Sequence, residues 1–423
     1  MTDDASVRPT REALNRADSG MTGLRDVLVS MLPSPRQSLL LKACLGPKAL
    51  APAAWRDWLA EVGDPKSVFE TDAAGLRGLL PFIGHCLDVN EIEVSDDFRV
   101  YLQISSVREE LRSNIYRQIL TETLSALRFA GCDVIALRAA ALSETVYDKP
   151  SIRHNHAIEL LVDPSQIQSA VDALAQLPFK RKEQRRAWQR QSHAFMHRSG
   201  LPVVLHTRLL LLPYHQVDLN EIWHDAGPAT LSGIETKVLS QVDGLVHVCA
   251  HASSSPGRGN LRWVCDAALT VRRYPGLNWD RVAERAQQLR LVLPLWAMFE
   301  YLARQLHTPI PEPVLTGLSR AAARADRVSR EAAIVGAVLG AASPADAIRR
   351  LRGKASARIL LARFLLLPSR TYMSWRYGVD RSWLLPFVHL YRFSKFAVFG
   401  VKRLIRRRPV PMSEERRLAA DAE

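Results

Sequence analysis

The spacing of apolar residues divides the chain into helical and strand-like stretches. Between residues 96 and 130, apolar side chains recur every three to five positions, which predicts one long helix, and Gly131 follows where a helix commonly ends. The residues that set this period are Leu102, Val107, Leu111, Ile115, Ile119, Leu124 and Leu127. From residue 37 to residue 88, shorter helical patterns alternate with Gly and Pro, which predicts a small helical region.

The period changes after the predicted long helix. Residues 132–137 and 158–162 are apolar runs that predict strands, and residues 139–147 between them suit a helix. A Pro-containing loop leads into the second run, which stops at Asp163. The order strand, helix, loop, strand is the centre of the predicted fold.

Further strands and helices follow this centre. Asp163 and Pro164 are residue types of a helix N-terminus, which predicts a helix that runs to Leu177. Residues 192–198 and 202–206 predict two more strands, joined by a Ser-Gly turn. Strands interleaved with helices predict an α+β fold, with a small mixed sheet and helices on one face.

Helical patterns return after residue 216. They predict helices at residues 239–253, 261–273, 280–289, 292–306 and 314–351. The chain is accordingly divided into a flexible N-terminus (1–36), a helical region (37–130), an α/β core (131–215), a helical domain (216–375) and a basic amphipathic tail (376–423).

Length and composition limit the number of domains, the state of the cysteines and the cellular location. The 423 residues, 47% of them hydrophobic, can build two domains with a core each. The five cysteines have no paired spacing and are expected to be reduced thiols. The polar N-terminus lacks the apolar stretch of a secretory signal, and no run approaches the ~20 apolar residues that span a bilayer. We therefore expect a cytoplasmic protein.

The positive charge is concentrated in two places. The formal net charge is +14; seven Lys or Arg and no acid lie between His389 and Arg408, and residues 180–190 hold six more beside Glu183. Such clusters favour polyanions or anionic membranes, although a solvated basic face explains them equally well. No specific nucleic-acid motif accompanies them.

An aromatic-rich stretch, residues 383–399, immediately precedes the last arginines of this basic segment. An apolar helix with a basic end is typical of elements that lie on a membrane surface. Peripheral attachment to the inner membrane face is therefore an alternative to a purely cytoplasmic location. The other interpretation is that the stretch packs on the protein and leaves its arginines in water.

Three short motifs resemble a known family. Leu137, Arg138 and Ala139 end the first predicted strand, Arg153 lies in the loop, and residues 157–162 read Ala-Ile-Glu-Leu-Leu-Val. They resemble the core of the uncharacterised nucleotidyltransferase family, in the DNA-polymerase-beta-like superfamily, which has Leu-Lys-Gly and Asp-apolar-Asp-Leu-Leu-Val at these places. Other segments look like family landmarks in family order, at residues 76–87, 205–206, 245–251, 261–269 and 278–280.

The resemblance implies a small mixed-sheet nucleotidyltransferase core flanked by N- and C-terminal helical regions. It also implies Mg²⁺ and a nucleoside triphosphate, with transfer of a nucleotidyl group to an unknown acceptor, which is a protein, a peptide or a small molecule. By the same resemblance, Arg138, Ser143 and Arg153 are the nucleotide-binding residues. For Arg153, an ion pair with Glu159 or Asp148 is an equally good alternative.

The carboxylates of the family are only partly retained. Acids at positions i and i+2 of a strand point to one face, where they can hold one pair of metal ions. Ala157 occupies the first position and Glu159 the second, and residues 202–206 contain no third acid, with Val203 and Val204 where the family often has one. We therefore predict that Glu159 is the remaining catalytic and metal-binding carboxylate and that two-metal catalysis is impaired or lost.

Histidines offer a replacement set of ligands. His156, His193 and His206 could converge with the retained carboxylate and bind Zn²⁺ or another transition metal. The alternative is that they are surface or hydrogen-bonded residues. His247 and His251 are one helical turn apart but lack the Glu of a zinc-protease motif, so core packing is predicted for them.

Three functions fit these residues. The first is a nucleotidyltransferase that moves a nucleotidyl group from a nucleoside triphosphate to its acceptor. The second is a catalytically inactive relative, a pseudoenzyme, that binds a nucleotide or a partner protein. The third is an accessory protein that binds an anionic membrane surface through its basic C-terminal tail, and it is compatible with either of the others.

Overall fold

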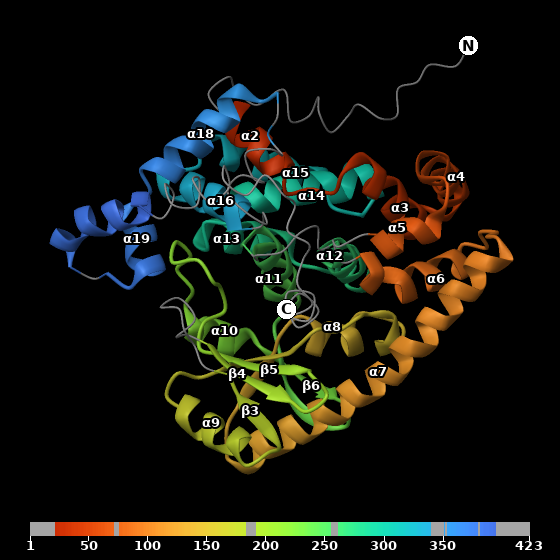
Figure 1. The fold of residues 1–423 in the computed structure, drawn as a ribbon, viewed down its shortest axis with the longest axis horizontal. Helices are drawn as coiled ribbons and strands as arrows, with labels where there is room; N and C mark the ends of the chain where they lie inside the picture. Colours follow the sequence, from red (N-terminus) through yellow and green to blue (C-terminus); the bar gives the residue numbers. More distant parts are fainter. Residues whose placement is uncertain are drawn as a thin grey trace.

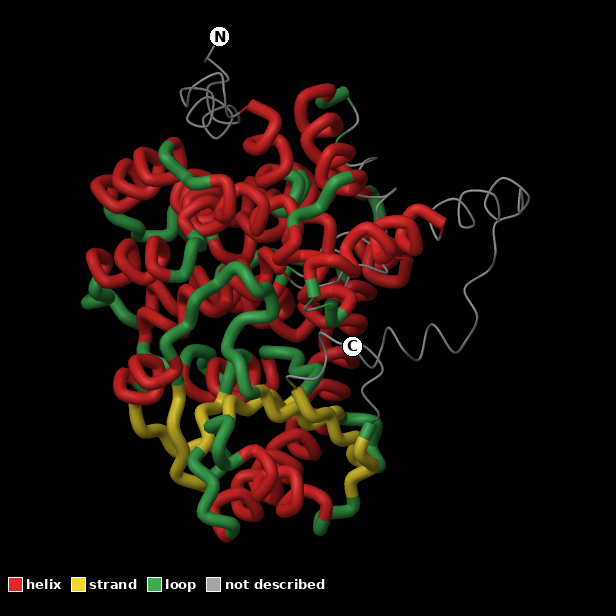
Figure 2. Tube along the Cα trace, turned by 90° about the vertical axis from the view of Figure 1, so that its left-hand side faces the viewer, coloured by secondary structure: helices red, strands yellow, loops and turns green. Residues whose placement is uncertain are grey.

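The computed structural model describes residues 22–71, 76–182, 192–254, 261–339, 351, 353–379 and 381–394. In this part of the chain, one mixed sheet lies toward one end and helices make up the rest (Figure 1, Figure 2). The architecture is α+β, which confirms the predicted fold class.

The described sheet has seven strands in the order β3-β4-β5-β2-β1-β7-β6. The pairs β1–β7 and β2–β5 are parallel, and the other pairs are antiparallel. The strands are β1 (Val134–Ala136), β2 (Ile158–Val162), β3 (Phe179–Arg181), β4 (Ser192–His197), β5 (Pro202–His206), β6 (Gly227–Leu231) and β7 (Ile234–Val238). Strands β1, β2, β4 and β5 lie where the sequence predicts strands.

Helices precede, cover and follow this sheet. The α-helices are α2 (Thr22–Val29), α3 (Pro35–Leu45), α4 (Ala51–Val62), α5 (Pro65–Thr71), α6 (Leu80–Val89), α7 (Asp96–Phe129), α8 (Ala139–Thr145), α9 (Ile167–Ala175), α10 (Leu219–Asp225), α11 (Gln241–Ser254), α12 (Arg262–Arg273), α13 (Trp279–Gln288), α14 (Val292–Leu306), α15 (Glu312–Ala323), α16 (Arg327–Leu339), α18 (Ala355–Leu366) and α19 (Arg370–Tyr377). Short 3-10 helices are η2 (Lys48–Leu50), η3 (Leu76–Leu79), η4 (Pro150–Ile152) and η6 (Ser382–Leu384).

The N-terminal helices begin earlier than predicted. Helix α2 (Thr22–Val29) packs against α16 and α18, so the prediction of a flexible segment 1–36 is wrong from residue 22 on. Residues 1–21 lie outside the described part. Ser34 and Gln37 form a capping box that starts α3, because each side chain bonds the other's backbone N–H.

The hairpin β6–β7 corrects the prediction that the chain is helical throughout residues 216–375. Along β7 the charged residues Glu235 and Lys237 share one face, and a two-residue turn at Ser232 and Gly233 joins the strands with φ angles of 47° and 84°. Such a turn with two positive φ values matches the twist of a hairpin. With five residues, three of them polar in succession, β7 has no strand pattern that stands out between the neighbouring helical patterns.

Helix α7 has two apolar stripes where the periodicity predicts one. Leu102 is buried, but a step of five residues to Val107 turns by about 140° and leaves the buried face. The buried stripe continues through Ile119, Leu124 and Leu127. The second stripe is 48–63% exposed and consists of Val100, Ile104, Val107, Leu111 and Ile115.

Helix α9 begins at Ile167, later than predicted. The carboxylate of Asp163 accepts hydrogen bonds from the backbone N–H of Ser165, at 2.8 Å, and from its hydroxyl, at 2.5 Å. Asp163 therefore forms a turn with the residue two positions on, and does not cap the helix.

The two faces of the sheet pack on different helices. Leu160 and Val162 share a core with α7 and α9, whereas Leu161 belongs to the larger core of the helical body. Figure 2 shows the strands between these two groups of helices. Because side chains alternate along a strand, Glu159 faces the helical body, as Leu161 does.

The last described residues, 385–394, are helical and follow η6. The basic residues 395–408 and residues 183–190 of the second basic cluster lie outside the described part. Every helix in the described ranges is too short or too polar to cross a membrane.

Candidate functional site

Arg138 joins the end of β1 to the start of α8. Its backbone has a positive φ of 44°, which is uncommon for a residue other than Gly. Its guanidinium forms an ion pair with the carboxylate of Glu159 on β2, and the two side chains are 15% and 14% exposed. Burial, reinforced by the nearby charge of Arg153, lowers the pKa of Arg138 to about 9, so the guanidinium stays positively charged at neutral pH.

Four side chains share one face of two neighbouring parallel strands. Ala157 and Glu159 are two positions apart at β2, Val204 and His206 are two positions apart on β5, and the register places Glu159 beside Val204. Nε2 of His206 is 3.4 Å from Oε1 of Glu159. The face therefore combines one acid and one histidine with two apolar residues.

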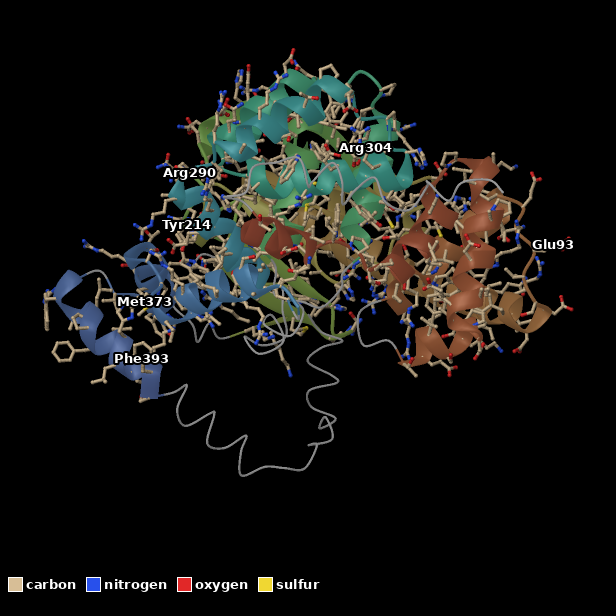
Figure 3. All side chains as sticks on the ribbon, turned by 90° about the horizontal axis from the view of Figure 1, so that it is seen from above. Glu93, Tyr214, Arg290, Arg304, Met373 and Phe393 are labelled. Atoms are coloured by element: carbon tan, nitrogen blue, oxygen red, sulfur yellow. The ribbon has the colours of Figure 1, made fainter. Side chains whose placement is uncertain are left out.

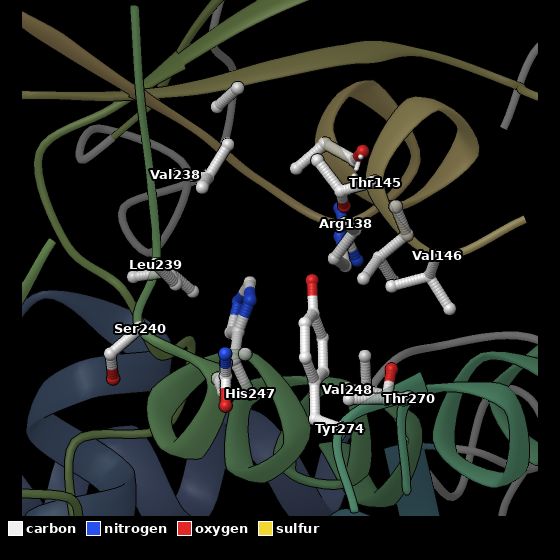
Figure 4. Close-up of a pocket in the computed structure, with 15 residues that line it drawn as sticks. Arg138, Thr145, Val146, Val238, Leu239, Ser240, His247, Val248, Thr270 and Tyr274 are labelled. Atoms are coloured by element: carbon white, nitrogen blue, oxygen red, sulfur yellow. Dashed lines mark hydrogen bonds between the residues drawn. The ribbon is translucent and has the colours of Figure 1, made fainter. Parts of the chain in front are cut away.

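A pocket opens beside this face, between the end of β1, α8, α11 and α12 (Figure 4). The cavity has a volume of about 50 Å³. Arg138, His247 and Tyr274 point into it from three different elements (Figure 4). Other polar residues that line it are Thr145, Ser240, Gln241 and Thr270.

The positive charge of Arg138 affects the pKa values of three nearby histidines. Burial lowers the pKa of His206 and that of His247 to about 3, and the charge of Arg138 acts in the same direction. Burial also holds the pKa of His251 well below its usual range, again with Arg138 as the next cause. The imidazoles are therefore neutral at physiological pH, and the arginine supplies the positive charge of the site.

Residues 71–307 match the family model described as "Uncharacterised nucleotidyltransferase". The chain belongs to this family. The match spans α7, all the described strands, α11 and α12, so the whole site lies inside the nucleotidyltransferase region. Membership confirms the family resemblance of the sequence motifs and supports a nucleotidyltransferase-like function. No curated protein and no solved structure matches the chain.

Nucleotidyltransferases in general use a nucleoside triphosphate with divalent metal ions. Mg²⁺ needs six oxygen ligands in near-octahedral geometry. Ala157 and Val204 carry no side-chain oxygen, and Glu159 is bound by Arg138, so these residues do not fit a two-metal site. Within the described ranges, no group of three or more His, Cys, Asp or Glu is placed to hold a metal ion.

The structure does not assemble the predicted histidine set. His206 lies beside Glu159, but His193 on β4 is paired with Leu205 in the strand register. Leu205 points to the α9 face of the sheet, so His193 points away from the site. There its Nδ1 is 3.2 Å from Nη2 of Arg181.

His156 belongs to a second polar cluster. Its ring packs edge-on against His154, with ring centres 4.4 Å apart, and Nδ1 of His154 lies 2.6 Å from Oε2 of Glu109 on α7. Burial raises the pKa of Glu109 to about 7 and lowers that of His154 to about 3, so the imidazole of His154 is neutral at physiological pH. The sequence offers no signal for Glu109, which is one of many charged residues along α7.

Arg153 has a structural partner. It forms a bidentate ion pair with Asp266 on α12, with distances of 2.9 Å from Nε to Oδ1 and 2.7 Å from Nη2 to Oδ2. The hydroxyl of Tyr147 donates to the same carboxylate at 2.6 Å. The ion-pair alternative therefore holds for Arg153, but its partner is neither Glu159 nor Asp148.

Ser143 is placed inside the protein. It is 2% exposed, and its hydroxyl donates a 2.8 Å hydrogen bond to the carbonyl of Ala139 one turn earlier in α8. This position does not fit the predicted contact with a nucleotide. His247 and Tyr274 line the pocket, whereas the sequence predicts core packing for His247 and no role for Tyr274. The histidine-rich helix is a usable signal for the first, and nothing in the sequence singles out the second.

Proposed function

We propose that this chain is a catalytically inactive member of the nucleotidyltransferase family that binds the triphosphate of a nucleotide at Arg138. The observation that carries the proposal is the ion pair between Arg138 and Glu159. In this pair a guanidinium takes the place that a divalent cation needs beside the retained carboxylate. The nucleotide is therefore expected to bind without a metal ion.

The donor chemistry of Arg138 supports this proposal. A guanidinium has five N–H donors in a planar fork, so it can pair with Glu159 and still donate to a phosphate oxygen. Arg153 and Arg262 also act on this guanidinium, against the carboxylate of Asp266. Together with the pair of Arg138 and Glu159, three guanidinium groups therefore meet two carboxylates. With the neighbouring histidines neutral, an anion entering the pocket meets an excess of positive charge.

The lining of the pocket supports binding of a phosphate group in a second way. Hydroxyl and amide groups of Ser240, Gln241 and Tyr274 line the same space as Arg138. Small-molecule sites commonly combine such a few converging polar groups with an apolar wall, here provided by Leu142, Val146 and Val248 among others.

Thermal unfolding in the presence of ATP, GTP, CTP or UTP tests the proposal. We expect at least one nucleotide to raise the unfolding temperature equally in Mg²⁺ and in EDTA. Arg138→Met should weaken that nucleotide at least about tenfold, since a charged hydrogen bond contributes roughly 1.5–3 kcal/mol. Arg99→Met, at an exposed arginine on α7, is the matched control and should bind as the wild type does.

Pyrophosphate release is measured in the same samples. A shift that requires Mg²⁺, together with pyrophosphate release, would identify an active transferase and overturn the proposal. The absence of any shift with all the nucleotides would overturn it as well.

A further inference from the structure

The C-terminal helical segment exposes a row of large apolar side chains. Trp383, Phe387 and Leu390 are 62%, 64% and 69% exposed. Their spacings of four and three residues place them on one side of a helix. Tyr391 and Phe393 extend the row with 50% and 40% exposure. Figure 3 shows Phe393 at the outer edge of the molecule, beyond Met373.

The opposite side of this segment is held against the protein. Leu385 and Val388 pack on the main core. Arg392 is 5% exposed, and its guanidinium lies 5.8 Å from the ring centre of Tyr372 on α19. The exposed row therefore belongs to a docked helix with a defined outer face.

The charged residues in this segment and just after it are all basic. From Arg381 to Arg408 the sequence contains eight Lys or Arg and no Asp or Glu. Aromatic and aliphatic residues followed by such a basic run combine the two interactions that hold proteins at a membrane surface, burial among acyl chains and attraction to anionic headgroups.

We propose that this outer face, Trp383, Phe387, Leu390, Tyr391 and Phe393, seats on an anionic lipid bilayer. The alternative occupant is the same face of a second copy. In a two-fold dimer, however, the face would meet itself and bring like charges together, whereas anionic lipid neutralises them. The basic run thus favours lipid as the occupant.

Vesicle sedimentation with the full chain tests this proposal independently of nucleotide binding. We expect binding to vesicles of equimolar phosphatidylglycerol and phosphatidylcholine, and little binding to phosphatidylcholine alone. The double variant Phe387→Ser/Leu390→Ser, and separately Arg406→Glu/Arg407→Glu, should each weaken binding at least about tenfold, given ~1 kcal/mol for each cation near the surface.

The matched control is Val107→Ser/Leu111→Ser on α7. These side chains are 59% and 63% exposed, so the pair removes a similar apolar area from a helix without a basic run. It should bind vesicles as the wild type does. Unchanged thermal unfolding of all variants shows that they are folded.

Three results would overturn the proposal. The first is absent binding, or equal binding to anionic and neutral vesicles. The second is an equal loss in the α7 variant and in Phe387→Ser/Leu390→Ser. The third is a concentration-dependent dimer that this C-terminal variant abolishes without any effect on vesicles, which would assign the face to a second copy.

Discussion

Arg153, in the loop before β2, and Asp266, in α12, form a bidentate ion pair in which both side chains are almost completely buried, at 8% and 5% exposure. Tyr147, which follows α8, donates to the same carboxylate. The pair thus fastens the loop that leads to Glu159 onto the helical body. It connects the polar face of the sheet to the helices across the pocket.

Removing one partner of this pair should destabilise the protein strongly. Arg153→Met or Asp266→Asn leaves the other charged group buried without compensation, which costs about 3–5 kcal/mol. Urea unfolding followed by circular dichroism measures the loss. The double variant Arg153→Met/Asp266→Leu removes both charges and should lose less than either single variant; a loss below about 1 kcal/mol in both single variants would contradict a structural role.

Restoring the missing acids should restore a metal response. In Ala157→Asp/Val204→Asp, one new carboxylate lies beside Glu159 in the strand register and the other lies two positions before it, on the same face. Arg138 pairs with one of these three acids, so two carboxylates remain for a metal ion. We expect Mg²⁺ to raise the unfolding temperature of this variant by a few degrees, as ion binding to the folded state does, and to leave the wild type unchanged.

The amide variant Ala157→Asn/Val204→Asn is the control, because it has nearly the same shape but no added charge. It should show no Mg²⁺ response. If the acidic variant also fails to respond, the assignment of these positions to the metal-facing side of the sheet is wrong.

The sequence predicts local elements and motifs better than partners. Strand β2 is found with its observed bounds, because its apolar run ends sharply at Asp163. That Arg153 pairs with an acid could be anticipated, but its partner lies 113 residues away, on helix α12. The pocket likewise depends on His247 and Tyr274, whose positions beside Arg138 are set only by tertiary packing.

The apolar period of a helix does not by itself predict which of its residues are buried. Val107 and Leu111 are part of the apolar period that predicts α7, together with residues that are buried, yet the structure exposes both. Periodicity identifies the helix but does not state which side a neighbouring element covers. The missed hairpin β6–β7 has the same cause, because a strand of five residues has too few alternations to stand out.

Acid should destabilise the protein through its buried histidines. Folding lowers the pKa of His154, His206 and His247 to about 3 and that of His156 to about 2, so the unfolded chain binds protons that the folded chain does not. The contribution of these histidines to the free energy of unfolding is therefore fully present above about pH 6.5. It is lost progressively as the pH drops toward about 3. One such histidine contributes a loss of about 2 kcal/mol between about pH 7 and pH 5.

Glu109 opposes this trend, which provides an internal check. Its pKa is raised to about 7 by folding. Its contribution to the free energy of unfolding is therefore fully present below about pH 4.5 and is lost as the pH rises through 7. Glu109→Gln should therefore steepen the acid-induced loss in urea unfolding, and His206→Gln/His247→Gln should flatten it. His224→Gln, at an exposed histidine, should keep the wild-type slope; the same slope in all variants would contradict this account.

Two helical glycines should respond to alanine in opposite directions. A Cβ added to Gly336 in α16 would lie 2.1 Å from the carbonyl oxygen of Ser253 in α11, so the two helices must separate. A Cβ on Gly317 in α15 meets no atom within 4 Å. We expect Gly336→Ala to lower the free energy of unfolding by about 1–3 kcal/mol, as overpacking does, and Gly317→Ala to raise it by up to about 1 kcal/mol.

Thermal and urea unfolding of the two glycine variants measure these changes. Because both replace Gly by Ala inside a helix, the gain in helix propensity is common to them. The difference between them therefore reports the close approach of α11 and α16. Equal stability of the two variants would show that these helices are not in contact at this point.

The pairing of β7 with β1 affects how the chain folds while it is being synthesised. The neighbour that completes one side of β1 is made roughly a hundred residues later, and contacts so distant in sequence form slowly. Until then β1 is an edge strand, whose free N–H and C=O groups can pair with another chain. A nascent or prematurely terminated chain that stops before Ile234 is thus expected to depend on chaperones, although most of its sheet has already been synthesised.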